Sequence, residues 1–177
     1  MLTYASVESA LAAMYGALNP DQRSTLKARI RNFQRLGVPL GVSPGKGQRI
    51  EYSDHQIWQW VFCLEFAELG IPPATIVEIL KQRWRPRIDR DLGIQAKFDD
   101  ASKMTVDDDD LYLCLSPSVM SQTWDARRTI VHFRWFTNAD ADLFLRNVFA
   151  AQRRACVLNV SDLLRELNKA LLEFRNK

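Results

Sequence analysis

The sequence is poor in cysteine and histidine, the residues on which most metal sites and many covalent active sites depend. It has three cysteines and two histidines in 177 residues. Cys63, Cys114 and Cys156 are widely separated and form no CxxC pair, so we expect free thiols in a reducing compartment rather than a disulfide framework or a metal site. A Cys/His pair that combines His132 with Cys114 or Cys156 is the alternative, but a histidine within a strand is usually structural. No cofactor is expected.

The sequence also lacks a recognisable catalytic constellation. No nucleophile, base and orienting group occur at a spacing typical of an enzyme, so we expect a protein that is not an enzyme. It lacks a long apolar run as well, because residues 57–69 are interrupted by Gln59 and Glu65 and are too short to span a bilayer. Residues 1–19 carry Glu8 and no basic residue, unlike a secretory leader. The expectation is a soluble cytoplasmic protein that does not contact a membrane.

Acidic residues are scarce in the first fifty positions, whereas basic residues are frequent there. Only Glu8 and Asp21 are acidic. The basic residues in the same segment are Arg23, Lys27, Arg29, Arg31, Arg35, Lys46 and Arg49. The whole chain has a net charge of only +3, so the positive charge is concentrated in this segment. A local excess of this kind indicates a polyanionic partner.

The spacing of apolar residues in the first half predicts short helices around one turn-rich segment. Helices are expected over 6–16, 22–36 and 53–69, and a fourth begins at Pro72. Ser53 and Gln56 form a capping-box pattern at the start of the third helix. Between the second and third of these helices, residues 38–52 contain the turn signal SPGKG, which predicts a β-hairpin, or wing.

The second half has a different pattern, in which strands and helices are mixed. Residues 91–110 are polar and end in four aspartates, which predicts a linker with solvated carboxylates. Strands are expected in 111–120, 129–137 and 155–160, and helices in 139–151 and from Ser161 onwards. The predicted fold is therefore α+β and mainly helical, with a DNA-binding domain at 1–90, a linker at 91–110 and a small α+β dimerisation or effector domain at 111–177.

The helix over 22–36 has the composition of a helix that reads DNA. Arginine can bond guanine bidentately in the major groove, and amide side chains can bond adenine. The polar positions of this helix are Arg23, Ser24, Lys27, Arg31, Asn32, Gln34 and Arg35. The wing adds Lys46, Gln48 and Arg49 as phosphate contacts, and Tyr52 completes the predicted set. We therefore expect double-stranded DNA as the partner.

Two segments of the chain resemble the MerR-type transcriptional regulators. IRNFQRLGV is similar to the family's IRYYERLGL at the end of the recognition helix, and GQRIEYSDHQIWQW with ELGIPPATIVEIL is similar to its wing and its third and fourth helices. The resemblance covers residues 5–82. It implies a winged helix-turn-helix that binds DNA as a homodimer in the bacterial nucleoid, with contacts from Arg31, its helical neighbours and Arg49. RNA polymerase is a further candidate partner.

The chain departs from the MerR pattern at three places. Asn32 and Phe33 replace the family's tyrosine pair, and the wing has one residue more between Arg49 and Tyr52 than the common pattern. Pro86 interrupts the segment that would form the family's long dimerisation helix. Two alternative functions follow from the same residues: an excisionase-like or architectural DNA-binding protein that assists a recombinase, and a sensor whose second half binds a small ligand. The aromatic run from Trp58 to Phe66 is expected in the core or in a dimer interface rather than in a ligand cage.

Overall fold

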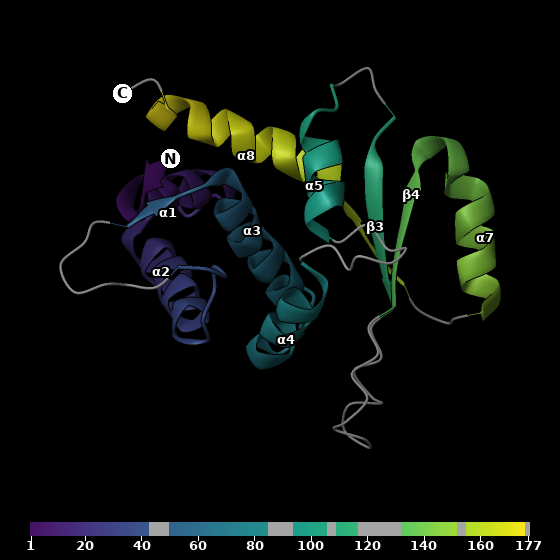
Figure 1. The fold of residues 1–177 in the computed structure, drawn as a ribbon, viewed down its shortest axis with the longest axis horizontal. Helices are drawn as coiled ribbons and strands as arrows, with labels where there is room; N and C mark the ends of the chain where they lie inside the picture. Colours follow the sequence, from purple (N-terminus) through teal and green to yellow (C-terminus); the bar gives the residue numbers. More distant parts are fainter. Residues whose placement is uncertain (43–49, 85–93, 106–108, 117–131, 152–154, 176–177) are drawn as a thin grey trace. The chain divides into compact units, whose positions relative to one another are not determined.

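The fold is α+β and mainly helical, as the sequence predicts (Figure 1). The computed structural model describes residues 1–42, 50–84, 94–105, 109–116, 132–151 and 155–175. The chain divides into two compact units: Met1–Ala96 with Glu166–Lys177, here named the N-terminal unit, and Lys97–Arg165, the sheet unit. Across the residues described, no helix combines the length and the apolar character needed to cross a bilayer.

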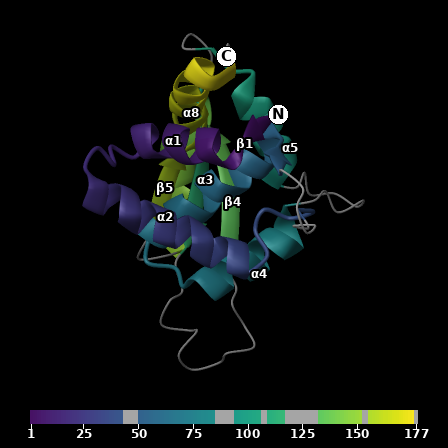
Figure 2. The ribbon, with the colours of Figure 1, turned by 90° about the vertical axis from the view of Figure 1, so that its left-hand side faces the viewer.

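In its described residues up to position 84, the N-terminal unit contains four helices and a short two-stranded ladder. They are α1 (Tyr4–Met14), α2 (Pro20–Arg35), α3 (Asp54–Glu68), α4 (Pro73–Arg83), β1 (Leu2–Thr3) and β2 (Glu51–Tyr52). In Figure 2, α1 and α2 lie in front of α3, and α3 contacts both α2 and α4. The predicted helices over 22–36 and 53–69 are confirmed. The first helix starts two residues earlier than expected, because Thr3 rather than Ser6 caps it.

Helix α3 is buried around most of its circumference, as its composition predicts. Its buried residues are Ile57, Trp58, Gln59, Trp60, Val61, Phe62, Cys63, Leu64 and Phe66. Ser53 and Gln56 form the predicted capping box at its start. Gly70 has a φ of 79° immediately after its end, a conformation that glycine adopts without steric cost. The aromatic run is therefore core.

The predicted wing hairpin over 38–52 is wrong in its first arm. Strand β2 pairs antiparallel with β1 from the amino terminus of the chain, with Leu2 opposite Tyr52. Residues 38–42 form a turn instead of a strand. A side chain of α3 explains this, because Leu40 donates its backbone N–H to Gln59 Oε1 at 2.6 Å rather than to a neighbouring strand. The SPGKG turn at 43–47 lies outside the described residues.

The predicted domain boundaries also differ from the observed units. Within the expected linker at 91–110, residues Ile94–Ser102 form helix α5, and Ile94, Phe98 and Ala101 are buried. Their spacing of four and three residues gives α5 one apolar face. The helix was missed because the segment over 91–110 is polar in its overall composition. The last part of α8 (Val160–Arg175) belongs to the N-terminal unit. There Arg175 Nη2 donates to Asp54 Oδ1 at 2.6 Å.

The sheet unit is a three-stranded antiparallel sheet in the order β4-β3-β5. Its strands are β3 (Leu111–Ser116), β4 (His132–Thr137) and β5 (Cys156–Asn159), and the 3₁₀ turn η1 (Asn138–Asp140) leads into α7 (Ala141–Ala151). The leucines at 111, 113 and 115 alternate along β3 and are buried. Cys114 lies between them on the opposite face, where it packs with Phe136 and Val148. The strands and helices that the sequence predicts in this half are confirmed where they are described.

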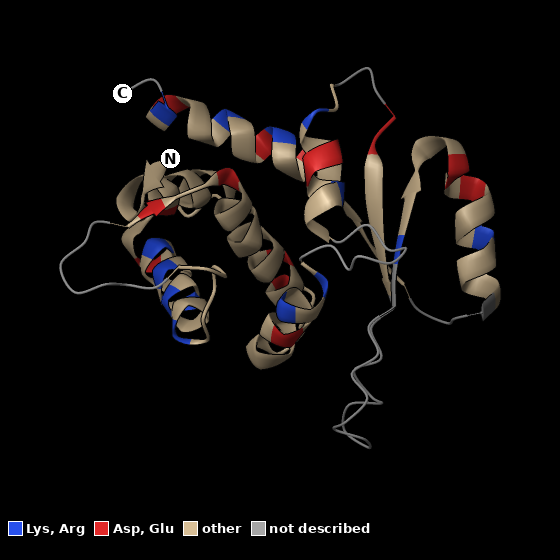
Figure 3. Ribbon diagram, viewed as in Figure 1, with Lys and Arg blue, Asp and Glu red and all other residues tan. Residues whose placement is uncertain are grey.

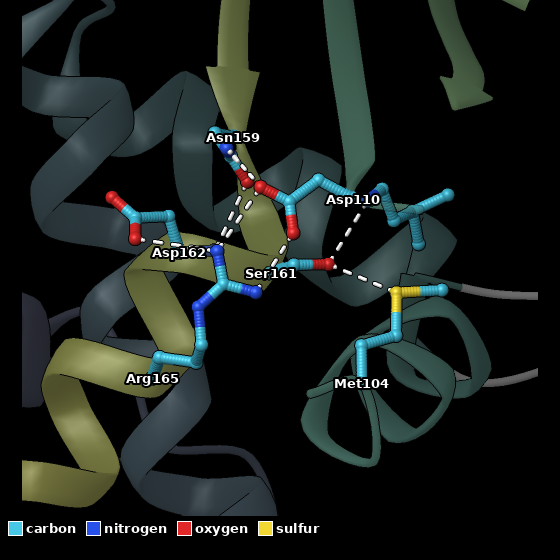
Figure 4. Close-up of polar contacts among 7 residues, drawn as sticks. Met104, Asp110, Asn159, Ser161, Asp162 and Arg165 are labelled. Atoms are coloured by element: carbon cyan, nitrogen blue, oxygen red, sulfur yellow. Dashed lines mark hydrogen bonds and ion pairs between the residues drawn. The ribbon is translucent and has the colours of Figure 1, made fainter. Parts of the chain in front are cut away.

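A polar cluster joins the start of α8 to the start of β3 (Figure 4). Arg165 donates to both carboxylate oxygens of Asp110, at 2.7 and 3.0 Å, and Asn159 Nδ2 donates to the same carboxylate at 2.8 Å. Ser161 Oγ accepts the Leu111 N–H at 2.9 Å and donates to Met104 Sδ at 3.0 Å. Asp110 is thus a structural ion-pair partner and not the solvated carboxylate that we expected.

The Asp110 carboxylate is expected to stabilise the fold in a pH-dependent way. The hydrogen bonds from Arg165 lower its pKa, so its contribution is present above the unfolded value of about 3.9 and is lost as the pH falls through the folded value. Asp110→Asn should lower the free energy of unfolding by about 1–3 kcal/mol at neutral pH. The difference from the parent protein should shrink towards zero as the pH falls through the lowered pKa of Asp110, because the parent then becomes protonated too.

Urea denaturation at several pH values measures this effect. The matched control is Asp142→Asn, because Asp142 forms an ion pair with Arg146 in which both side chains are largely exposed. Such pairs contribute about 0–1 kcal/mol. Equal losses in the two variants at neutral pH would contradict a special role for Asp110.

Candidate nucleic-acid interface

Helix α2 has a buried face and a polar face on opposite sides. Leu26, Ile30 and Phe33 point into the core, with exposed fractions of 8%, 0% and 2%. At about 100° per residue, Asp21 in the first turn lies on the side opposite these three, and further along the helix that side is formed by Ser24, Ala28, Arg31, Asn32 and Arg35. We call these five residues the outer face of α2. Asn32 is half-buried and the other four are exposed.

The outer face is positively charged, and its two arginines have no anionic partner in the part of the chain that the structure describes. Figure 3 shows basic residues repeated along α2. No ion pair joins Arg31 or Arg35 to any described carboxylate. A guanidinium keeps its charge at any physiological pH and presents five donors in a fixed plane. Both side chains are therefore available to an external anion.

Two basic residues that we expected at the interface instead connect α2 to α1. Arg23 donates from Nε to the carbonyl oxygen of Ala17 at 3.2 Å, and Lys27 Nζ lies 3.3 Å from Glu8 Oε1. Both lie between the core side and the outer face of α2, which explains why Lys27 reaches α1 and Arg23 reaches the turn after α1, although both side chains remain partly exposed. Arg29, on the other flank, forms an ion pair with Glu68 of α3. The predicted contact set therefore reduces on α2 to Ser24, Arg31, Asn32 and Arg35.

Arg31 lies between two shallow hollows at the edge of the outer face. One hollow of about 630 Å³ is formed on α2 itself, by Arg31, Ala28, Gln34 and Arg35. The other, of about 500 Å³, joins α2 to the start of α1 and to β2. It is lined by Thr3, Tyr4, Ala5, Arg31, Gln34, Ile50 and Tyr52. The surface beside Arg31 is thus shared by three elements that are far apart in the sequence.

The first turn of α1 is the part of this surface that sequence reasoning missed. The first N–H groups of a helix have no partner within the helix and carry a partial positive charge. Thr3 Oγ1 accepts the N–H of Ser6 at 3.3 Å, and Thr3, Tyr4 and Ala5 at this end of α1 line the Arg31 hollow. The sequence contains a signal for this N-cap: Thr3 is followed three residues later by Ser6, just before an apolar run.

Trp60 of α3 supports the two elements that flank Arg31. Its buried indole lies 6.2 Å from the Tyr4 ring and 4.6 Å from the Tyr52 ring, measured between centroids. Tyr52 is 2% exposed, so its ring packs in the core, and it also lines the hollow beside Arg31. Burial raises the pKa of the Tyr52 hydroxyl, and the neighbouring Gln34 side chain acts in the opposite direction. Tyr52 therefore supports this surface from below, and its DNA contact stays a prediction.

Three further residues of the predicted contact set fall on the turn of the wing. Lys46, Gln48 and Arg49 lie outside the described residues. Of the two cysteines in the alternative Cys/His pair, Cys114 is buried, which raises the pKa of its thiol, and Cys156 is half-buried. Among the residues that can be inspected, no three histidine, cysteine or acidic side chains are grouped as metal ligands.

Comparison of the chain with protein-family models, with curated proteins and with solved structures finds no match. The class of site therefore rests on the chain's own geometry. It is a basic helical face with two arginines that have no ion-pair partner among the described residues, placed next to the amino terminus of a second helix and supported by a buried tryptophan.

Substitution of Tyr52 separates a structural role from a contact role. Tyr52→Ala removes the ring packed on Trp60 and should lower the free energy of unfolding by about 3–5 kcal/mol. Tyr52→Phe keeps the ring, so it should change stability by less than about 1.5 kcal/mol and leave binding to a DNA duplex unchanged. Thermal unfolding and fluorescence anisotropy measure the two effects. Weaker DNA binding by Tyr52→Phe at unchanged stability would show that the hydroxyl is a contact after all.

Proposed function

We propose that the N-terminal unit binds double-stranded DNA through the outer face of α2, and that the protein is a DNA-binding transcriptional regulator. The observation that supports this best is the pair of exposed arginines, Arg31 and Arg35, one helical turn apart, with no carboxylate partner among the described residues. An arrangement of this kind is unfavourable unless an anion compensates it, since like charges at this spacing repel each other.

The dimensions of α2 suit the major groove. A helix with its side chains is about 10–12 Å wide, and the groove is about 12 Å wide. Ala28 lies at the centre of the outer face, where a small side chain allows close approach to the bases. Arg31 and Arg35 would bond guanine edges or phosphates, and Ser24 and Asn32 would supply shorter hydrogen-bonding groups. The four polar residues around Ala28 could thus supply base contacts as well as phosphate contacts that fix the position of the helix along the DNA.

The hollow beside Arg31 would hold a phosphate of the DNA backbone. It combines a guanidinium with the positive end of α1, and both favour a bound anion. A phosphate there would fix the depth and angle of α2 in the groove, because backbone contacts set register while base contacts set specificity. This contact would replace the one that the MerR-type tyrosine pair provides, which is absent at Asn32 and Phe33.

The regulatory part of the proposal rests on the resemblance of residues 5–82 to the MerR-type regulators. Such proteins bind two half-sites as homodimers, and half-site spacing then mirrors the symmetry of the dimer. We propose that this chain also acts as a homodimer in the cell. Genome-wide mapping of bound DNA would test both statements, since a regulator occupies promoters and a dimer leaves paired half-sites about 10 base pairs apart or at multiples of that distance.

Alanine substitution of the two outer-face arginines tests DNA binding directly. Arg31→Ala and Arg35→Ala should each weaken binding to a mixed-sequence duplex by about tenfold at low salt, a loss of about 1.4 kcal/mol. If the lost contact is to a phosphate, the slope of log K against log salt should also fall by about 1. Fluorescence anisotropy over a salt series measures both quantities.

The matched control is Arg146→Ala, which removes the same charge from an exposed side chain on α7 of the sheet unit. It should leave the affinity unchanged. An equal loss in all three variants would indicate a general charge effect, and the absence of salt-dependent binding by the parent protein would contradict the proposal.

A further inference from the structure

A third hollow lies on the opposite flank of α2 from the Arg31 hollow. It is enclosed by the end of α1, the first half of α2 and the end of α3, and its volume is about 610 Å³. Proteins bind small molecules in hollows of about 300–1,000 Å³ that combine an apolar lining with a few polar groups. Ala17, Leu26 and Leu64 supply the apolar part and are each less than 9% exposed. The size and lining are thus suited to a small organic molecule.

A tyrosine–carboxylate pair forms one wall of this hollow. Tyr15 donates its hydroxyl hydrogen to Glu65 Oε1 at 2.8 Å. Burial raises the pKa of the Glu65 carboxyl, the Tyr15 hydrogen bond lowers it, and the negative charges of Glu68 and Glu166 raise it again. Burial and the same carboxylate raise the pKa of Tyr15 well above its usual range. Glu65 is therefore held in a place where a negative charge is unfavourable unless a cation compensates it.

No cation of the described chain performs that role. Tyr15 is the only hydrogen-bond donor to Glu65 among the described residues, and the nearby Arg29 is paired with Glu68 instead. Asp21 adds a further negative charge to the lining. The carboxylates of Asp21, Glu65 and Glu68 therefore outnumber the single guanidinium. The hollow has a negative excess although α2 as a whole is basic.

We propose that this hollow binds a small organic cation, a primary amine or guanidinium carried on a short apolar body. The cationic group would lie at the free oxygen of Glu65, with Glu68 as its second partner, and the body would pack on Leu26 and Leu64. The inference does not depend on DNA binding, because occupancy can be measured on the free protein. It goes beyond the proposed function by giving the N-terminal unit a ligand of the opposite charge on the other flank of the same helix.

Phenethylamine is a suitable probe, and 2-phenylethanol is its neutral counterpart of nearly equal size. With about nine non-hydrogen atoms at roughly 0.4–0.5 kcal/mol each, the amine should bind the full-length chain with a Kd of about 1 mM. The alcohol should bind at least about tenfold more weakly, because only the amine compensates the carboxylates. Titration followed by amide chemical shifts in NMR measures both values and locates the perturbed residues.

Charge-neutralising variants then assign the site. Glu65→Gln should weaken amine binding about tenfold. Glu68→Gln should weaken amine binding too. Because Glu68→Gln leaves the Tyr15–Glu65 hydrogen bond in place, it tests the site even if Glu65→Gln proves unstable. The matched control is Glu78→Gln, because Glu78 is exposed on α4 and pairs only with Lys81 among described side chains. It should bind the amine like the parent protein.

Three results would overturn the proposal. They are the absence of saturable binding at amine concentrations of about 10 mM, equal affinity for the amine and the alcohol, and parent-like affinity in both Glu65→Gln and Glu68→Gln. None of these outcomes bears on the arginine variants of the outer face, so the ligand site and the DNA-binding proposal can fail separately.

Discussion

The burial of α3 on nearly all sides is the constraint on which the N-terminal unit depends. Its side chains contact α1, α2, α4 and β2. Trp60 supports Tyr4 of α1 and Tyr52 of β2, and Gln59 binds the backbone at Leu40. Because an aromatic side chain buries a large apolar area, each of these contacts stabilises the position of an element as well as the core. The hydrophobic effect thus sets the geometry of a polar surface that α3 itself does not reach.

Helix α2 brings two surfaces of opposite charge close together without neutralising either. Arg31 and Arg35 occupy the outer face, whereas Glu65 and Glu68 of α3 line the hollow on the other flank. Arg29 lies on the flank of α2 that faces the hollow, where it forms an ion pair with Glu68 of α3. A ligand in the hollow and an anion on the outer face would both act on the placement of one rigid helix. That shared element is the physical basis on which the two proposed sites could be coupled.

Local features of the fold could be predicted from the sequence, whereas pairings between distant segments could not. The Ser53–Gln56 capping box depends on neighbouring residues only, and it was predicted. The pairing of β1 with β2 was missed, because a two-residue strand has no period to detect. The candidate site shows the same division. Its arginines on α2 were predicted from the sequence, but the part of the site formed by residues 3–5 exists only because the start of α1 packs beside α2 in the fold.

By itself, the sequence determined the helical periods, the capping box of α3, the basic charge of α2 and the apolar character of α3, because each is a property of residues within a few turns of one another. Only the tertiary structure decided which charges remain available. Arg23 and Lys27 are as basic as Arg31 and Arg35, yet the first two meet Ala17 and Glu8 on α1 and its following turn. The reason is rotational: once Leu26, Ile30 and Phe33 are buried, every other side chain of α2 has a fixed direction, and packing selects its partner.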